Sequence, residues 1–255
     1  MWGHETVGNR APKVPLRTQS RDELERILDA ETPLFALLSN TQLLIRRFEG
    51  SMIDLHSLAQ MRSEIERSTQ LKEQEWSDFA AIFRPLTLKK NSNVVFPGDT
   101  TSGLYFVCSG LLRYYYATDD GKEWNKAFVA ENSLAASFSQ DFLGYPTPYG
   151  IQALEDTVLL SARYGDFETL CERHISIERL GRRFVEQILR VKLMRERSFL
   201  EHDATSRYRD FLRQNAALSG RIPQYHLASY LGISEVSLSR LRGQIFELEK
   251  DANST

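Results

Sequence analysis

The sequence has few of the residues that support covalent or metal-centred chemistry. Cys108 and Cys171 are its only cysteines, too few for a disulfide framework or a four-cysteine zinc or iron–sulfur site. The histidines are His4, His56, His174, His202 and His226. None falls within the strand-like residues 85–163, where a sensor haem or metal would need its ligands. The sequence therefore predicts no metal site and no cofactor.

Long apolar runs and a strong net charge are also lacking. Nowhere do about 18 uncharged apolar residues follow one another, and the N-terminal segment has no apolar core like that of a signal peptide. We therefore expect a soluble, cytoplasmic protein with no membrane partner. A net charge of −2 and an isoelectric point near 6.3 exclude a histone-like binder that is basic over its whole surface. Arginines are nevertheless frequent from residue 182 to residue 242, so any basic surface is local.

The pattern of apolar residues changes along the chain and suggests five segments. We predict a flexible leader at residues 1–20 and an N-terminal helical region at 21–83. A strand-rich domain follows at 84–175, then one long helix at 176–202. A helix-turn-helix domain takes up residues 203–255. Helices on both sides of an antiparallel strand domain give an α+β fold class.

Short alternating segments between residues 85 and 163 are typical of strands in an antiparallel barrel or sandwich. Turn dipeptides separate them: Pro97-Gly98, Ser109-Gly110 and Asp120-Gly121. The last lies between two strand-like runs, so it predicts a β-hairpin.

The helix at 176–202 has apolar residues near heptad spacing along a wide face. We expect self-association through this face, by the residues Ile177, Leu180, Phe184, Ile188, Val191 and Met194. The alternative is that the helix packs only against the strands of its own chain. Gln187, at a position that a coiled coil keeps apolar, weakens the coiled-coil interpretation.

Residues 224–242, QYHLASYLGISEVSLSRLR, are typical of a DNA-binding helix-turn-helix. Leu227, Ala228 and Leu231 share one face of a first helix, and the small Ala228 allows a second helix to cross closely. Gly232 suits the positive φ that often follows a helix, and Ser234 can cap the next helix. Ile233, Leu238 and Leu241 complete a small core.

The predicted DNA-contacting residues lie on the start of the first helix or on the outer side of the second. They are Gln224, Tyr225, Ser234, Glu235, Val236, Ser237, Ser239 and Arg240. Arg240 has the donors to bind guanine, Glu235 can accept from cytosine, and Val236 can touch a thymine methyl. An ordinary pair of packed helices remains the alternative.

Two blocks in this order resemble the Crp/Fnr family of transcription regulators: NVVFPGDTTSGLYFVCSGLLRYYYATDDGKE and, after the long helix, IPQYHLASYLGISEVSLSR. The resemblance covers about Leu71 to Ile245. It implies a sensor β-roll (a double-stranded β-helix, jelly-roll-like), a dimerisation helix and a winged helix-turn-helix domain.

The sequence departs from the members of that family that bind cyclic AMP. Ala136 and Ser137 stand where those members have Gly-Glu, and Thr147 and Pro148 where they have Arg-Ser. A buried phosphate without a guanidinium is poorly compensated, so we expect no cyclic nucleotide. The same segment has four aromatic residues that either line an effector pocket or fill the roll: Phe138, Phe142, Tyr145 and Tyr149.

Together these features predict a non-enzymatic transcription regulator that binds double-stranded DNA as a homodimer. Contacts with RNA polymerase and with a small-molecule effector stay open. The alternative function is a ligand-binding signalling module that acts through protein partners. A cupin-like enzyme would need His and Glu ligands inside the roll, and the positions of the histidines disfavour it.

Overall fold

The computed structural model describes residues 47–48, 51–52 and 54–252, with side chains from residue 54 to residue 245. The predicted leader at 1–20 and the helices expected before residue 47 lie outside the described residues. A short pair of strands, β1 (Arg47–Phe48) and β2 (Ser51–Met52), precedes helix α2 (Leu55–Glu66). Asp54 caps α2 by accepting a hydrogen bond from the Ser57 amide at 3.3 Å. Helix α3 covers Glu73–Ala81.

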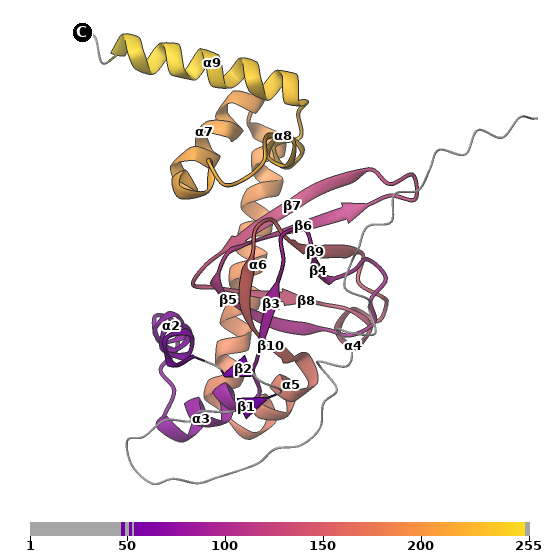
Figure 1. Cartoon of the computed structure of the whole chain (residues 1–255), viewed down its shortest axis with the longest axis vertical. Helices are drawn as coiled ribbons and strands as arrows, with labels where there is room; N and C mark the ends of the chain where they lie inside the picture. The colour runs from indigo at the N-terminus through magenta and orange to yellow at the C-terminus, as the bar shows by residue number, and fades with distance from the viewer. Residues whose placement is uncertain (1–46, 49–50, 53, 253–255) are drawn as a thin grey trace, which may run out of the picture. The chain divides into compact units, whose positions relative to one another are not determined.

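The predicted antiparallel roll is present as two four-stranded sheets (Figure 1). One has the order β3-β10-β5-β8 and the other the order β4-β9-β6-β7. The first comprises β3 (Arg84–Leu88), β10 (Thr157–Arg163), β5 (Gly103–Ser109) and β8 (Ser133–Ser137). The second comprises β4 (Asn93–Val95), β9 (Tyr149–Ala153), β6 (Leu111–Ala117) and β7 (Glu123–Ala130).

The predicted turns form where glycine is required. Gly98, Gly110 and Gly121 all have positive φ, a region that costs glycine little. Gly121 lies in the β6–β7 hairpin, as its dipeptide predicts, and the Thr118 amide donates to the Lys122 carbonyl across the turn at 3.0 Å. The same hairpin contains a β-bulge. Tyr114 pairs with Ala127 but Tyr115 pairs with Asn125, which leaves one extra residue in β7.

Helices cover the outer face of the β3-β10-β5-β8 sheet. Helix α4 (Gln140–Leu143) follows β8, and α5 (Tyr164–Arg173) leads into the long α6 (Ile175–Glu201). The buried side chains between sheet and helices form one cluster that includes Met61, Phe79, Phe106, Leu160 and Phe167. Burial of these apolar groups holds α2, α3, α5 and the start of α6 on the roll.

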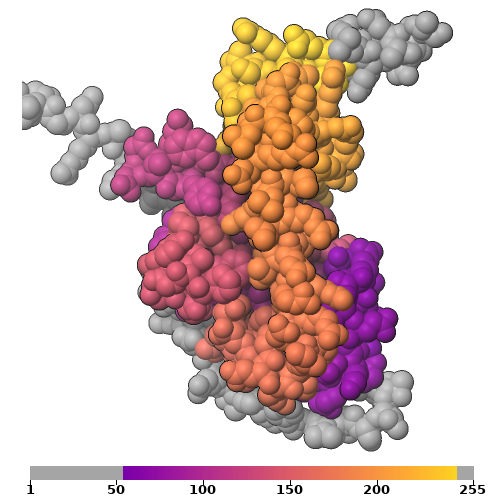
Figure 2. All heavy atoms as spheres, turned by 180° about the vertical axis from the view of Figure 1, so that it is seen from behind, coloured from indigo at the N-terminus to yellow at the C-terminus, as the bar shows by residue number. Residues whose placement is uncertain are grey.

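The start of α6 therefore faces its own chain. Ile177 and Leu180 are 0% and 4% exposed in that cluster, and Phe184 is partly buried against it. Of the residues predicted for self-association, Ile177 and Leu180 are thus covered by side chains of their own chain. Further along, the helix is open to solvent on one side, as the space-filling view shows (Figure 2).

The C-terminal part contains α7 (Ala204–Gln214), a 3₁₀ turn η1 (Ala216–Leu218), α8 (Gln224–Leu231) and α9 (Glu235–Ala252). A wing would require a strand hairpin in this part, but every strand of the described residues precedes α5 and α9 continues to Ala252. The predicted wing is therefore not found in the described part of the chain. None of the described helices has the length and apolar character needed to cross a bilayer.

Candidate nucleic-acid interface

The turn between α8 and α9 has the geometry that the sequence predicts. Gly232 ends α8 with φ 71°, and the Ile233 amide donates to the Ala228 carbonyl at 3.1 Å, which closes the helix. Ser234 caps α9, since its Oγ accepts from the Ser237 amide at 3.1 Å. A Cβ at residue 232 would lie 2.8 Å from a ring carbon of Phe199. Glycine is therefore required both by backbone conformation and by space.

The predicted core of this module is also present. Leu227, Ala228 and Leu231 are each 2% exposed and Leu238 is 0% exposed. Ile233 and Leu241 pack against them with partial burial. The small Ala228 at the crossing therefore does what the sequence predicts, since it is buried where α8 meets α9.

The eight predicted DNA-contacting residues are all exposed: Gln224, Tyr225, Ser234, Glu235, Val236, Ser237, Ser239 and Arg240. Tyr225 and Val236 keep 52% and 62% of their surface in solvent, although both are large. Their exposure meets the steric requirement for reading base edges.

The C-terminal end of α8 is held by the end of α6 and the start of α7. Arg195 donates from Nη2 to the Tyr230 carbonyl at 2.8 Å, and Arg207 donates from Nε to the Leu231 carbonyl at 3.1 Å. Both guanidinium groups lie over the Phe199 ring at 4.7 Å. Two positive charges therefore meet the last carbonyls of α8, where the helix dipole favours cations.

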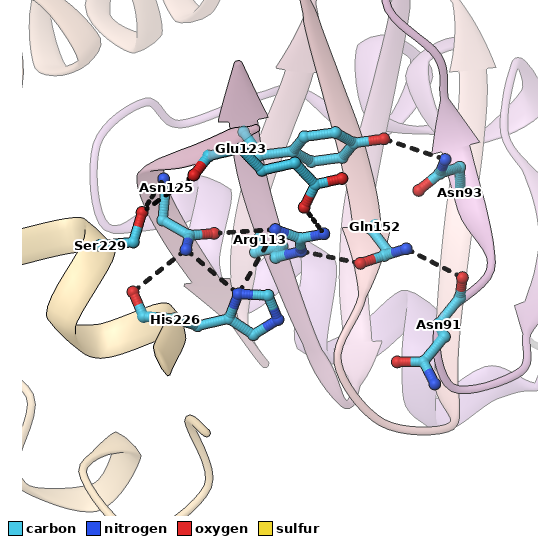
Figure 3. A network of polar contacts seen from close by, with 9 residues as sticks. Asn91, Asn93, Arg113, Glu123, Asn125, Gln152, His226 and Ser229 are labelled. Atoms are coloured by element: carbon cyan, nitrogen blue, oxygen red, sulfur yellow. Dashed lines mark hydrogen bonds and ion pairs between the residues drawn. The ribbon is translucent and has the colours of Figure 1, made fainter. Parts of the chain in front are cut away.

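A buried polar network joins α8 to the roll (Figure 3). Arg113 on β6, Asn125 on β7 and His226 on α8 are 3%, 4% and 5% exposed. Asn125 accepts at Oδ1 from Arg113 Nη1 at 3.2 Å, and its Nδ2 lies 3.1 Å from both Nδ1 and the carbonyl oxygen of His226. Arg113 Nη1 also lies 3.4 Å from His226 Nδ1.

The remaining donor atoms of Arg113, Nε and Nη2, bind two side chains of the roll. It donates from Nε to Gln152 at 2.8 Å and from Nη2 to Glu123 at 2.6 Å. Its guanidinium also stacks over the Tyr115 ring at 4.3 Å. A buried charge is tolerated when it is paired and hydrogen-bonded, and Arg113 meets that requirement.

The surroundings of His226 determine its protonation state. Both groups near Nδ1, an amide NH₂ and a guanidinium, are donors, so Nδ1 accepts and the ring proton lies on Nε2. Burial, and then the positive charge of Arg113, lower the pKa of His226 to about 3. His226 is therefore neutral at physiological pH.

Apolar contacts and an ion-pair cluster complete this docking surface. Leu111 and Leu154 of the roll are buried in the same cluster as the helix-turn-helix core, and the rings of Phe128 and Tyr230 lie 5.2 Å apart. Arg221, just before α8, donates to Glu131 at 2.8 Å and also pairs with Glu155. The hydrogen bond from Arg221 lowers the pKa of Glu131 below its usual range.

The roll interior near the family's cyclic-nucleotide positions is filled by aromatic side chains. Tyr114 is buried and its hydroxyl bonds both the amide and the carbonyl of Ala136 at 3.0 Å. Tyr149 is 5% exposed and accepts at its hydroxyl from the Phe138 amide at 3.0 Å. Lys126, the extra residue of the β7 bulge, places Nζ 3.9 Å from the Tyr149 ring centre. Burial, with a smaller effect of Lys192, lowers the pKa of Lys126 to about 8.

The four aromatic residues, expected either to line one pocket or to fill the roll, lie in different environments. Phe138 and Phe142 stack at 4.6 Å and line a cavity of about 630 Å³ bounded also by Tyr164 of α5 and by Val185 and Leu189 of α6. Tyr149 instead lies in the roll interior and Tyr145 is 52% exposed outside that cavity. The cavity is lined by the acidic Glu168, Glu172, Glu178 and Glu186, with one cation, Arg182.

Sequence reasoning missed the polar network and Lys126. A signal was available for Arg113, because a charged residue inside the run LLRYYY of a predicted strand requires a buried partner. No signal pointed to Asn125 or His226 as that partner, since they lie 12 and 113 residues away. The bulge that places Lys126 is equally invisible in a period-two pattern.

Comparisons with known proteins agree with this architecture. Residues 85–174 match the family model of the cyclic nucleotide-binding domain. No curated protein sequence matches the chain.

Several solved structures share the fold. FixK2 from Bradyrhizobium japonicum superposes with a TM-score of 0.59 at 17% identity, over 66% of this chain and 86% of that chain. A CooA mutant from Carboxydothermus hydrogenoformans gives 0.57 at 20% identity, over 70% and 82%. A transcriptional regulator of the Crp/Fnr family from Eubacterium rectale gives 0.57 at 17% identity, over 70% and 85%. The chain thus has the fold of Crp/Fnr-type transcription regulators, with a cyclic-nucleotide-binding-type roll at residues 85–174.

Proposed function

We propose that this protein is a homodimeric transcription regulator that binds a two-fold symmetric DNA site through α9. The observation that carries the proposal is the state of the α8–α9 module. Its turn and core are fully formed, while its candidate reading residues, Val236 and Arg240 among them, remain in solvent. Val236 keeps 62% of its surface in solvent, so its side chain is free to contact DNA.

The chemistry of α9 suits direct reading of the major groove. Arg240 can give two donors to guanine N7 and O6, Glu235 can accept from a cytosine amine, and Val236 can contact a thymine methyl. Ser237 and Ser239 supply short hydroxyls for phosphates or base edges. Gln224 and Tyr225, at the start of α8, are placed for contacts with the DNA backbone.

Dimerisation is proposed through a row on α6 that differs from the one predicted from the sequence. Leu189, Leu193 and Leu200 are 54%, 53% and 81% exposed, and Val185 extends the row at the same helical spacing. Val185 and Leu189 also border the cavity beside Phe138 and Phe142, so a second copy on this row would help to close that cavity. Of the predicted dimer residues, Val191 and Met194 line a cavity of about 490 Å³ beside α7, on another side of the helix. Ile188 is half-buried.

Oligomeric state tests this row. Leu189→Glu and Leu193→Glu place a charge in the proposed dimer contact and should convert the dimer to monomer in light scattering at micromolar concentration. Val191→Glu, on the same helix and 54% exposed, is the matched control and should stay dimeric. If Val191→Glu dissociates the dimer while Leu189→Glu does not, the row is misassigned.

The function itself is tested by selecting bound sequences from a random duplex pool. Half-sites about one helical turn (~34 Å) apart are expected in a palindrome. Affinity should fall steeply with salt, because phosphate contacts release counterions. A module that acts through protein partners would enrich no sequence and would lack that salt dependence.

Arg240 has a matched control on its own helix. Arg240→Ala should weaken binding to the selected site by about 1–3 kcal/mol and relax the preference at one base pair. Arg242 is two residues further, roughly 200° around the helix, and Arg242→Ala should leave the base preference unchanged. Equal effects of the two substitutions on base preference would contradict the role of Arg240.

We propose that Phe138 and Phe142 form part of an effector site. Tyr145 and Tyr149 do not line this cavity and are not part of the site. The cavity beside Phe138 and Phe142 is of a size typical of small-molecule sites. Its aromatic wall and acidic lining favour a neutral or cationic ring compound over an anion.

A further inference from the structure

The helix-turn-helix meets the roll through a surface that is partly apolar and partly hydrogen-bonded. The apolar part, around Leu111, Leu154 and Phe128, favours contact between the two but does not favour one orientation over another. Orientation has to come from directional contacts. Those available are the network of Arg113, Asn125 and His226 and the Arg221 ion pairs.

The network is well suited to fix an orientation. Asn125 is its centre: the side chain bonds Arg113 and His226, and the backbone amide donates to Ser229 Oγ at 2.9 Å. The Asn125 carbonyl oxygen in turn lies 3.4 Å from Arg195 Nη2, which also donates to the Tyr230 carbonyl. One residue of β7 therefore contacts both α8 and the helix that carries the module.

A rotation of α8 on the roll would break this network at once. Arg113, Asn125 and His226 are each at most 5% exposed, so water cannot replace the lost partners without opening the surface. Gln152 and Glu123 of the roll hold Nε and Nη2 of Arg113, so the guanidinium cannot follow a moving helix. The roll side of the network is thus rigid and the α8 side must conform to it.

We propose that Arg113, Asn125 and His226 are positioning residues that lock the DNA-binding module in one orientation on the roll, which sets the spacing between the two half-sites that the dimer accepts. The locked orientation leaves Val236 and Arg240 in solvent, as contact with DNA requires. These residues touch no base. They act by limiting the freedom of α9.

Two readouts test the lock, and only the second, spacing discrimination on DNA, rests on the proposed function. The first readout is independent of DNA: carbethoxylation of histidines in the full-length protein, followed by mass spectrometry. His226 is shielded in the locked state, whereas His202 has a 40% exposed side chain and serves as the internal reference. Asn125→Ala should raise the rate of His226 modification relative to His202 by roughly threefold or more.

The matched control is Asn93→Ala. Asn93 is an asparagine of β4, the strand at the opposite edge of the same sheet from β7, and its Nδ2 donates to Tyr115 Oη at 3.1 Å, with no contact to α8 in the network. It should leave the His226 rate at the wild-type value. Circular dichroism and dimer mass establish that each variant is folded. Arg113→Lys, which keeps the charge but loses the fork of donors, provides a second variant if Asn125→Ala does not fold.

The second readout is spacing discrimination. Wild-type protein is expected to prefer the selected palindrome over one with two inserted base pairs. In Asn125→Ala, a docked fraction that falls to about one third lowers affinity for the correct site about threefold per module, thus about tenfold for a dimer. The same variant should lose most of its discrimination against the longer spacing, because freed modules reach either site.

The outcomes separate the two ideas. Unchanged His226 reactivity in both Asn125→Ala and Arg113→Lys overturns the lock. Increased reactivity with unchanged spacing discrimination shows that the network holds the module without setting the spacing, and overturns that part. If wild-type protein selects no DNA, the proposed function fails, and the reactivity result still decides whether the module is locked.

Discussion

Neutral His226 makes the docked module sensitive to acid, and the size of the effect follows from its pKa. The pKa is about 3 in the structure, whereas an exposed histidine has a pKa near 6.5. The undocked or unfolded state therefore binds the proton more readily. Linkage then requires stability to rise with pH between about 3 and 6.5 and to be constant above that window.

The magnitude is about 1.4 kcal/mol for each pH unit below 6.5. From pH 7.5 to pH 5.5 only the last unit lies inside the window, so the expected loss from this one side chain is about 1.4 kcal/mol. At pH 4.5 it is about 2.7 kcal/mol. A proton on His226 Nδ1 would face the positive charge of Arg113, whose Nη1 lies 3.4 Å away. It would also face the NH₂ group of Asn125, so two hydrogen-bond donors would point at each other.

His226→Asn is the informative variant, since its amide oxygen can accept near the position of Nδ1 but does not titrate. Urea unfolding of wild type and His226→Asn should be compared at pH 8.5, 7.5, 6.5, 5.5 and 4.5. The difference in unfolding free energy should be flat from pH 8.5 to 7.5. Between pH 7.5 and pH 5.5 the wild type should lose about 1.4 kcal/mol of unfolding free energy relative to His226→Asn. A difference that stays flat to pH 4.5 would refute the assignment of a buried neutral histidine.

Two further changes test the turn and the cavity. Gly232→Ala should lower the free energy of unfolding, measured in urea, by about 1–2 kcal/mol because of its positive φ alone. The contact of the new Cβ with Phe199 should add to that loss. The control is Gly243→Ala in α9, where no atom lies within 4 Å of the added Cβ, and it should be neutral or stabilising. Phe142→Ala should weaken binding of the neutral fluorophore N-phenyl-1-naphthylamine by about 1 kcal/mol, roughly fivefold, in a fluorescence titration. Tyr145→Ala is the control, because Tyr145 lies outside the cavity lining, and an equal loss in both variants would place the fluorophore elsewhere.

Local patterns were sufficient for the elements and for the turn of the helix-turn-helix. Gly121 between two alternating runs predicts the β6–β7 hairpin because its conformation is set by immediate neighbours. Gly232 and Ser234 predict the α8–α9 turn for the same reason. The same patterns do not tell which apolar residues of α6 are covered by their own chain. An apolar stripe such as Ile177 and Leu180 looks the same whether a sheet of the same chain or a second copy covers it.

The sequence by itself determined the order of strands, long helix and two-helix module, because propensity, turn residues and apolar period act over a few positions. Only the tertiary structure decided which side of α6 stays open and that Phe138 and Tyr149 belong to different environments. It also decided that Arg113 meets Asn125 and His226. The reason is physical: a buried charge demands partners but does not specify them, and the fold chooses them by bringing distant side chains within hydrogen-bonding distance.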